Sequence, residues 1–187
     1  MNKMKDKCRF ATALLFAMVI SYHSVNAQSK HLRLVFIRHA EKPRDGENLS
    51  CKGFNRSILL PDLLFKKFGV PTNIYVPSID PGESTKHCRM FQTITPFAVK
   101  FNLAINSEYN ESDSKNIGNA LLKEKGTIII VWEHKAMLSV IRHLGITSDF
   151  KWPDDDFDSI WIVTFEKGRV ILTKDKEGLK PSDNCSF

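Results

Sequence analysis

The chain alternates short apolar runs with longer stretches in which apolar residues recur every three or four positions. The run TIIIVW at 127–132 is β-branched and apolar throughout, and a strand at 32–37 ends in the apolar run LVFI. Such runs are typical of strands that are buried on both faces of a sheet. A shorter strand is expected at 73–76, and a closing hairpin at 160–165 and 170–173.

Stretches with a helical period lie between these strands. Their expected bounds are 50–68, about 85–101, about 113–125 and 133–145. Ser50 is placed to cap the first of them and Gly69 to end it. Pro61 and Pro96 fall inside helical stretches, and each is expected to kink or split its helix.

This order of elements predicts the fold class and the domain organisation. Alternating strands and helices indicate an α/β fold, a three-layer sandwich with a mainly parallel central sheet and helices on both faces. The chain contains no internal repeat, low-complexity segment or linker that would indicate a second domain. One domain is expected over 28–187.

The first 27 residues have the pattern of a secretory signal peptide. A basic start with Lys3, Lys5, Lys7 and Arg9 precedes an uncharged, mostly apolar run at 10–20. This run is 11 residues long, whereas a membrane-spanning helix needs about 20. The sequence therefore predicts cleavage after Ala27, a periplasmic or secreted protein, and no stable membrane anchor once the signal is removed.

Removal of residues 1–27 also lowers the net charge. Those residues hold four Lys or Arg and one acidic residue, so 27 basic and 21 acidic residues become 23 and 20, a net charge of +3. This surplus is small, and the chain has neither a basic run nor an aromatic ladder. Nucleic acid is therefore not an expected partner.

Three cysteines remain after cleavage: Cys51, Cys88 and Cys185. Export makes a disulfide feasible, and an odd number leaves at least one cysteine outside it. The preferred pair is Cys51 with Cys185, because it ties the C-terminal tail to the body of the domain. None of the cysteine spacings is typical of a zinc site.

Two of the predicted strands end in the same chemistry. The strand at 32–37 leads into Arg38-His39, and the strand at 127–132 leads into Glu133-His134. Ligands of parallel sheets bind at the carboxyl ends of the strands. Arg89 lies near the start of the helix predicted at about 85–101, after the second strand, and can face the same crevice. Two arginines and two histidines repel one another around an empty site, so their convergence indicates an oxyanion such as phosphate.

These residues resemble the histidine phosphatase superfamily, which has the phosphoglycerate mutase-like fold. The Arg-His-Gly hallmark of that family is Arg38-His39-Ala40 here, followed by Glu41. The segments LSCKGFNRS at 49–57 and RMFQT at 89–93 match two further motifs, and His134 matches the second catalytic histidine. The resemblance covers about 32–165, and the sequences RHAEKP and WEH favour a small exported branch.

The resemblance implies a mechanism without metal or cofactor. His39 would attack phosphorus to give a phosphohistidine, Arg38 and Arg89 would bind the phosphoryl oxygens, and His134 would stabilise the developing charge. Ala40 stands where the family has glycine, and Asn48 is the only counterpart offered for an asparagine usually found after the first motif.

The general acid is less clearly indicated than the nucleophile. The interval where the family places a glutamate offers Glu108, Glu111, Asp113 and Glu124, and Glu133 adjoins the second histidine. The candidates for the general acid are Glu111, Asp113 and Glu133, with a helix N-cap as the structural alternative for Asp113.

Two more basic residues are candidate phosphate ligands. Lys42 follows the first motif and is otherwise a solvated loop residue, and Arg56 is otherwise a structural ion-pair partner. The acidic segment PDDDFD at 153–158 is interpreted as a turn rather than a metal site.

The leading hypothesis is an exported phosphohydrolase that acts on a small phosphorylated substrate or a phosphoprotein. The main alternative is a non-catalytic module that binds phosphorylated ligands on the same fold, and a histidine-based metalloenzyme is a third. Arg38 disfavours the third, because a cation beside His39 disfavours a metal ion. The sequence leaves the substrate and the oligomeric state open.

Overall fold

The computed structural model describes residues 32–79 and 87–185. The predicted signal peptide at 1–27 and the segment 80–86, which includes the predicted start of the second helix, lie outside the described residues. Within the described part, no helix is long and apolar enough to cross a membrane.

A six-stranded sheet forms the middle of the fold, in the order β3-β2-β4-β1-β5-β6. Its strands are β1 (Arg33–Arg38), β2 (Asn73–Tyr75), β3 (Ile105–Asn106), β4 (Thr127–Trp132), β5 (Ser159–Glu166) and β6 (Arg169–Lys176). The pairs β3–β2, β2–β4 and β4–β1 are parallel, whereas β5 runs antiparallel to both β1 and β6. The predicted α/β fold with a mainly parallel sheet is confirmed.

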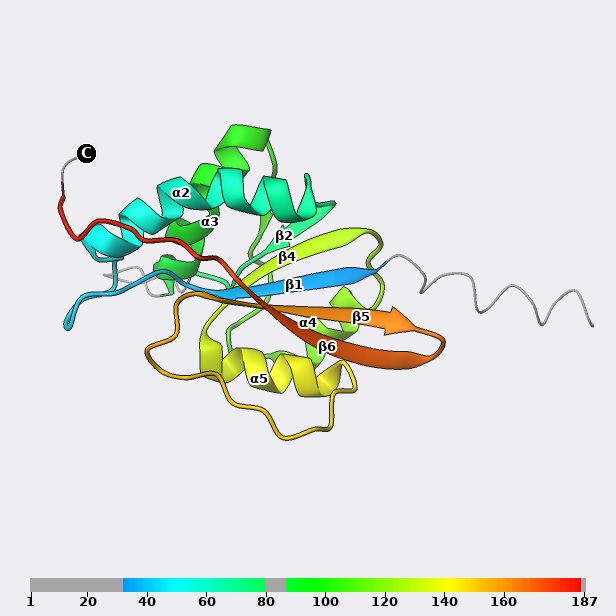
Figure 1. Ribbon diagram of the computed structural model, residues 1–187. Helices are drawn as coiled ribbons and strands as arrows, with labels where there is room; N and C mark the ends of the chain where they lie inside the picture. Colours follow the sequence, from blue (N-terminus) through cyan, green and yellow to red (C-terminus); the bar gives the residue numbers. More distant parts are fainter. Residues whose placement is uncertain (1–31, 80–86, 186–187) are drawn as a thin grey trace, which may run out of the picture. The chain divides into compact units, whose positions relative to one another are not determined.

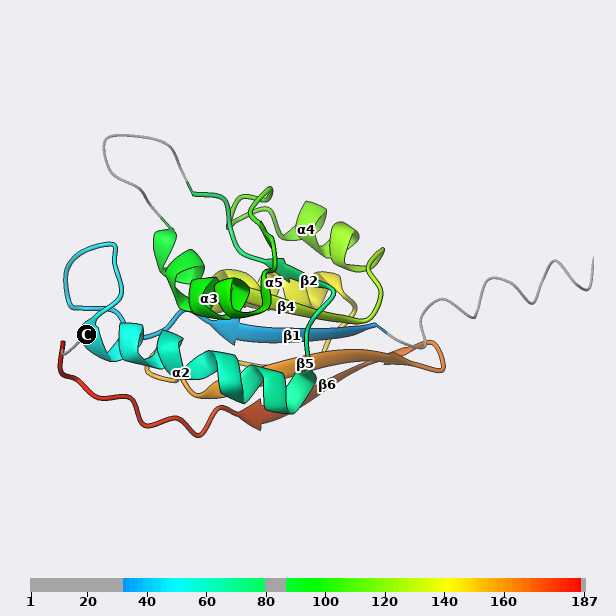
Figure 2. The same cartoon turned by 90° about the horizontal axis from the view of Figure 1, so that it is seen from above.

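Helices cover both faces of this sheet (Figures 1 and 2). They are α2 (Cys51–Phe68), α3 (Cys88–Phe101), α4 (Ser114–Leu121) and α5 (His134–His143). The pair α2 and α3 packs on one face, and the pair α4 and α5 packs on the other. The predicted three layers are therefore present.

The apolar run of β1 is continuous because the two faces bury alternate residues. Leu34 and Phe36 belong to the core under α4 and α5, and Val35 and Ile37 belong to the core under α2 and α3. All four side chains are fully buried. The polar residues that follow, Arg38 and His39, are also buried, so their polar groups need partners at this end of the strand.

Each proline was expected to kink or split its helix, but both lie inside unbroken helices, so neither α2 nor α3 is split. A proline removes one backbone hydrogen bond. In each helix, fully buried neighbours compensate for that loss: Leu60 and Leu64 around Pro61, and Ile94 and Phe97 around Pro96.

The C-terminal tail lies against the start of α2. Cys51 and Cys185 form a disulfide with a Cα–Cα distance of 5.0 Å, as preferred from the sequence. Asn55 Nδ2 donates to the backbone oxygens of Ser182 and Asn184, at 2.9 Å each. The disulfide joins residues 134 positions apart, so the end of the chain is held against the start of α2.

Candidate active site

Arg38 and His134 lie at one edge of the sheet because β1 and β4 are parallel neighbours. Arg38 at the end of β1 is in register with Trp132 at the end of β4. His39 and Glu133 follow these two residues, and His134 begins α5. The prediction that both histidines come from adjacent strand ends is therefore matched by the register.

His39 is held as a neutral ring with one nitrogen available. The ring is 3% exposed, and Nδ1 lies 2.7 Å from the carbonyl oxygen of Ala40. A carbonyl only accepts, so Nδ1 carries the proton and Nε2 keeps its lone pair. Burial lowers the pKa of His39 to about 4; the Ala40 hydrogen bond opposes this shift, and the charges of Arg38 and Arg89 reinforce it.

Arg38 is buried and is fixed by the loop that precedes β5. Its Nη1 donates to the backbone oxygens of Asp154 at 2.8 Å and Asp156 at 3.3 Å. The guanidinium also lies 4.0 Å from the ring centroid of Phe157, which packs edge-on against His39. Burial lowers the pKa of Arg38, and the carboxylates of Glu133 and Asp154 oppose that shift.

The start of α3 supplies Arg89 together with two residues that fix the neighbouring backbone. Arg89 Nη1 donates to Gly46 O at 3.1 Å. Gln92 accepts from Leu49 N, and Thr93 Oγ1 accepts from Ala40 N at 2.9 Å. The segment RMFQT thus holds the backbone beside His39 as well as carrying a cation.

His134 lies between two carboxylates. Nε2 is 2.7 Å from Asp154 Oδ1, and Nδ1 is 2.6 Å from Glu133 Oε1, although the second approach lacks hydrogen-bond geometry. Glu133 Oε2 accepts from the backbone N–H groups of Lys135 and Ala136 and so caps α5.

Three buried side-chain nitrogens in the described part of the chain have no hydrogen-bond partner: Arg38 Nε, Arg89 Nε and His134 Nδ1. Each belongs to a different predicted site residue. A buried polar atom without a partner is costly, and such atoms indicate an absent ligand or a functional role. The oxygens of a phosphoryl group are the acceptors that these donors require.

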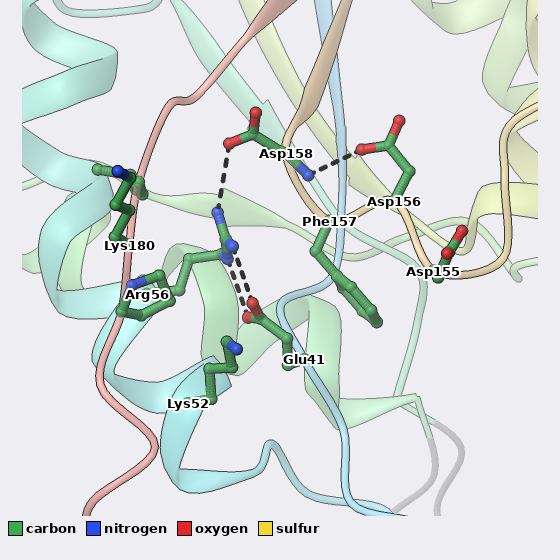
Figure 3. Close-up of a pocket in the computed structure, with 10 residues that line it drawn as sticks. Glu41, Lys52, Arg56, Asp155, Asp156, Phe157, Asp158 and Lys180 are labelled. Atoms are coloured by element: carbon green, nitrogen blue, oxygen red, sulfur yellow. Dashed lines mark hydrogen bonds and ion pairs between the residues drawn. The ribbon is translucent and has the colours of Figure 1, made fainter.

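Arg56 lies in a cluster of ion pairs rather than beside His39. Its guanidinium binds Glu41 through two hydrogen bonds of 2.8 and 2.9 Å, and Nη1 lies 4.0 Å from Asp158 Oδ1 (Figure 3). Nη1 also lies 2.5 Å from Glu177 Oε2. These carboxylates raise the pKa of Arg56 despite its burial. Burial raises the pKa of Glu177 to about 7, because three carboxylates share one guanidinium and Glu177 is the most deeply buried. The contacts of Arg56 favour the structural alternative.

Gly53, the glycine of the segment LSCKGFNRS, stands where no larger residue fits. A Cβ on Gly53 would lie 2.1 Å from the backbone oxygen of Glu41, a contact that no side chain makes. α2 therefore packs directly against the backbone that follows His39 and Ala40.

A hollow of about 550 Å³ adjoins the Arg56 cluster. Figure 3 shows Lys52 and Lys180 beside Glu41 and Arg56, with the Asp155–Asp158 segment on the other side. Neither His39 nor His134 lines it, and Phe157, which does, also packs against His39. The hollow is thus a neighbour of the candidate active site.

The other candidate acids have partners of their own. Asp113 caps α4 by accepting from Asn116 N, and Glu111 Oε2 is 2.8 Å from His87 Nδ1. Glu124 accepts from the Tyr75 hydroxyl and from Asn73 Nδ2. Glu111 follows β3 at the same end of the sheet as the two histidines, and its carbonyl accepts from Trp132 Nε1.

Lys42 is exposed. Among residues 32–79 and 87–185, no group of three or more His, Cys, Asp or Glu side chains could hold a metal ion.

The sequence reasoning missed the contributions of Asp154 and Phe157. Both come from the PDDDFD segment, which was interpreted only as an acidic turn. The signal that could have found them is an aromatic residue within an acidic run that precedes a strand, because such a loop can reach the carboxyl edge of the sheet.

No protein-family model and no curated protein matches the chain. Among solved structures, the chain is similar to the protein histidine phosphatase SixA complexed with tungstate, with a TM-score of 0.57 and 15% sequence identity over 78% of this chain and 97% of that one. It is also similar to a SixA protein from Agrobacterium tumefaciens assigned as a phosphohistidine phosphatase, with a TM-score of 0.53 and 18% identity over the same shares. The fold implied by the resemblance is therefore confirmed.

Proposed function

We propose that this protein is an exported phosphohydrolase that acts through a phosphohistidine intermediate on His39. The observation that carries the proposal is the set of three unpartnered buried nitrogens on Arg38, Arg89 and His134, which surround a buried neutral histidine. The fold shared with histidine phosphatases supports the same reaction.

In the first step, the lone pair of His39 Nε2 attacks phosphorus. The N–P bond forms as the bond from phosphorus to the leaving group breaks, and the leaving group departs with that electron pair. Arg38, Arg89 and His134 donate to the phosphoryl oxygens and stabilise their charge. The Nδ1 hydrogen bond to Ala40 O holds the ring in the reactive tautomer.

In the second step, water attacks the phosphohistidine. An O–P bond forms and the N–P bond breaks, so the lone pair returns to His39 Nε2 and inorganic phosphate leaves with both protons of the water, as dihydrogen phosphate. The same three donors stabilise this transition state, because the phosphoryl oxygens occupy the same place.

The leaving group that suits this site is one that needs little help from an acid. Glu133 and Asp113 are engaged as helix caps, and Glu111 is hydrogen-bonded to His87. Phosphohistidine in a protein is such a substrate, since its leaving group is an imidazole. The two similar structures are described as a protein histidine phosphatase and a phosphohistidine phosphatase. We therefore propose a phosphorylated protein as the substrate class.

The second candidate function is a module that binds phosphorylated ligands without turnover. The observation that favours it is the engagement of the candidate acids Asp113, Glu111 and Glu133. Such a module would use the same arginines and His134.

Export is part of the proposal. The disulfide between Cys51 and Cys185 fits an oxidising compartment. The basic and apolar pattern of residues 1–27 fits a cleaved signal.

The test uses the purified chain from residue 28 with an activated aryl phosphate and with a phosphohistidine peptide, in the absence of added metal. We expect turnover of both, a phosphate label on His39 by mass spectrometry, and a loss of at least about 1,000-fold in His39→Ala. His143→Ala is the matched control, because His143 contacts Asn119 outside the site. Phosphate binding without turnover would establish the binding module, and neither binding nor turnover would overturn both functions.

A further inference from the structure

Asp154 contacts two of the proposed site residues at once. Its backbone oxygen accepts from Arg38 Nη1 at 2.8 Å, and its side-chain Oδ1 lies 2.7 Å from His134 Nε2. Arg38 ends β1 and His134 begins α5, so these two residues come from different elements. Asp154 belongs to neither, because it lies in the loop before β5.

The loop that carries Asp154 is anchored on both sides. The Asp156 carboxylate accepts from the backbone N–H groups of Asp158 and Ser159 at 3.0 Å and from the Ser159 hydroxyl at 2.6 Å. Trp152 is buried in the core, and its Nε1 donates to Asp156 O. Asp154 is therefore presented by a fixed backbone, although its side chain is 73% exposed.

The contact with His134 differs from an ordinary surface ion pair. Lys135 Nζ lies 3.6 Å from the same oxygen of Asp154, and its side chain is 71% exposed. His134, by contrast, is buried, and its Nδ1 has no hydrogen-bond partner, although Glu133 Oε1 lies 2.6 Å from it. The His134 hydrogen bond, followed by the charge of Lys135, lowers the pKa of Asp154, which keeps it a carboxylate at neutral pH.

We propose that Asp154 is a positioning residue for the proposed phosphoryl transfer, on which this inference rests. Its carboxylate accepts from His134 Nε2 and thereby fixes the rotation of the ring, so that Nδ1 points at the transferring phosphoryl group. Partners of this kind orient histidine rings that act on a ligand through their other nitrogen. Its backbone oxygen at the same time orients Arg38.

These two contacts respond differently to substitution. Any residue at position 154 retains the backbone oxygen and hence the contact with Arg38. Only residues with a side-chain acceptor of the right length retain the contact with His134. The two effects of Asp154 can therefore be separated by changing its side chain alone.

The test compares Asp154→Ala and Asp154→Asn in the protein with its disulfide intact. We expect Asp154→Ala to lower kcat about 10- to 100-fold with KM changed less than about threefold, because second-layer partners of histidines have effects of that size. Asp154→Asn keeps an acceptor oxygen and should recover most of the lost kcat.

Two controls match the charge and the position of Asp154. Asp155→Ala removes the adjacent exposed carboxylate, and Lys135→Ala removes the other charged partner of Asp154. Both should stay within about twofold of the unaltered protein. An unchanged kcat in Asp154→Ala, or an equal loss in Asp155→Ala, would overturn the proposal.

A second readout does not depend on turnover. Nitrogen NMR of ¹⁵N-histidine-labelled protein reports the proton on His134 Nε2, and His134→Gln identifies its signal. That signal should persist in Asp154→Asn and shift or broaden in Asp154→Ala. Identical His134 signals in all three proteins would overturn the positioning role, whether or not the protein proves to be a phosphatase.

Discussion

His39 combines deep burial with a hydrogen bond that leaves its second nitrogen available. Burial disfavours the charged ring, and the nearby Arg38 and Arg89 disfavour it further. The proposed nucleophile therefore stays unprotonated in acidic solution, where an ordinary histidine is charged. The same arrangement makes the stability of the protein depend on pH.

We expect the stability contributed by neutral His39 to be lost as the pH falls. The pKa is about 4 in the folded protein and near 6.5 when exposed, so between these values the unfolded chain binds more protons. The contribution is fully present above pH 6.5 and has declined by about 3 kcal/mol once the pH is below 4. Urea unfolding at pH 4, 5.5 and 7 should show a steeper decline for the unaltered protein than for His39→Gln. Parallel curves would contradict the assigned environment of His39.

At the scale of single residues, the sequence could predict the basic residues of the candidate site but not the residues that hold them in position. Arg38, His39 and His134 follow apolar strands, and this pattern is visible in the chain. Asp154 is one of three consecutive aspartates, and only the folded loop distinguishes it from Asp155. Residue type and order carry no information about which of them faces His134.

The helices near the site begin at residues that the sequence offered as acids. Glu133 caps α5 through two backbone N–H groups, and Asp113 caps α4 through Asn116 N. A carboxylate in this position satisfies donors that the helix leaves open and lies at the positive end of the helix dipole. These two carboxylates have a structural role that accounts for their placement.

Replacement of Asp113 distinguishes a role as the N-cap of α4 from a role as the general acid. Asparagine is as good an N-cap as aspartate, so Asp113→Asn should leave both kcat and stability almost unchanged. Asp113→Ala should lower the free energy of unfolding by about 1 kcal/mol, again with little change in kcat. Thermal unfolding and turnover measured on both variants check this. A large loss of kcat in Asp113→Asn would instead identify Asp113 as the acid.

The long periodic elements could be predicted, and so could the short strand β2 and the bounds of the proline-containing helix α2, but β3 could not. The predictions for β1, β4 and α5 agree with the structure within two residues at every end. β3 has two residues, too few to show any period. Pro61 misled the prediction because burial of α2 against the sheet, a tertiary effect, outweighs one lost hydrogen bond.

Over the whole molecule, the C-terminal tail connects α2 to the loop beside the site. Cys185 is bonded to Cys51, and Glu177 pairs with Arg56, which also holds Glu41. Glu177 N donates to Asp158 O in the loop that fixes Arg38. The tail thus joins the start of α2 to the loop before β5, which contacts the candidate site.

Loss of the disulfide should destabilise the fold. The bond joins residues 134 positions apart, and removal of such links lowers the free energy of unfolding by about 2–5 kcal/mol. Urea unfolding of the double variant Cys51→Ser/Cys185→Ser should show this decrease. Dithiothreitol should produce a similar decrease in the unaltered protein and none in the double variant. Equal stability of the two proteins without reductant would show that the other tail contacts suffice.

The central place of β1 in the sheet also determines when the sheet can form during synthesis. Its partners are synthesised much later: Thr127, which Arg33 contacts, is 94 positions further along the nascent chain, and β5 follows still later. The four apolar residues from Leu34 to Ile37 therefore lack their strand partners until most of the chain has left the ribosome. His39 acquires its buried environment only after these strands have paired, so the proposed nucleophile does not form on an incomplete chain. A protein translocated across a membrane before it folds would therefore have no phosphatase activity during translocation.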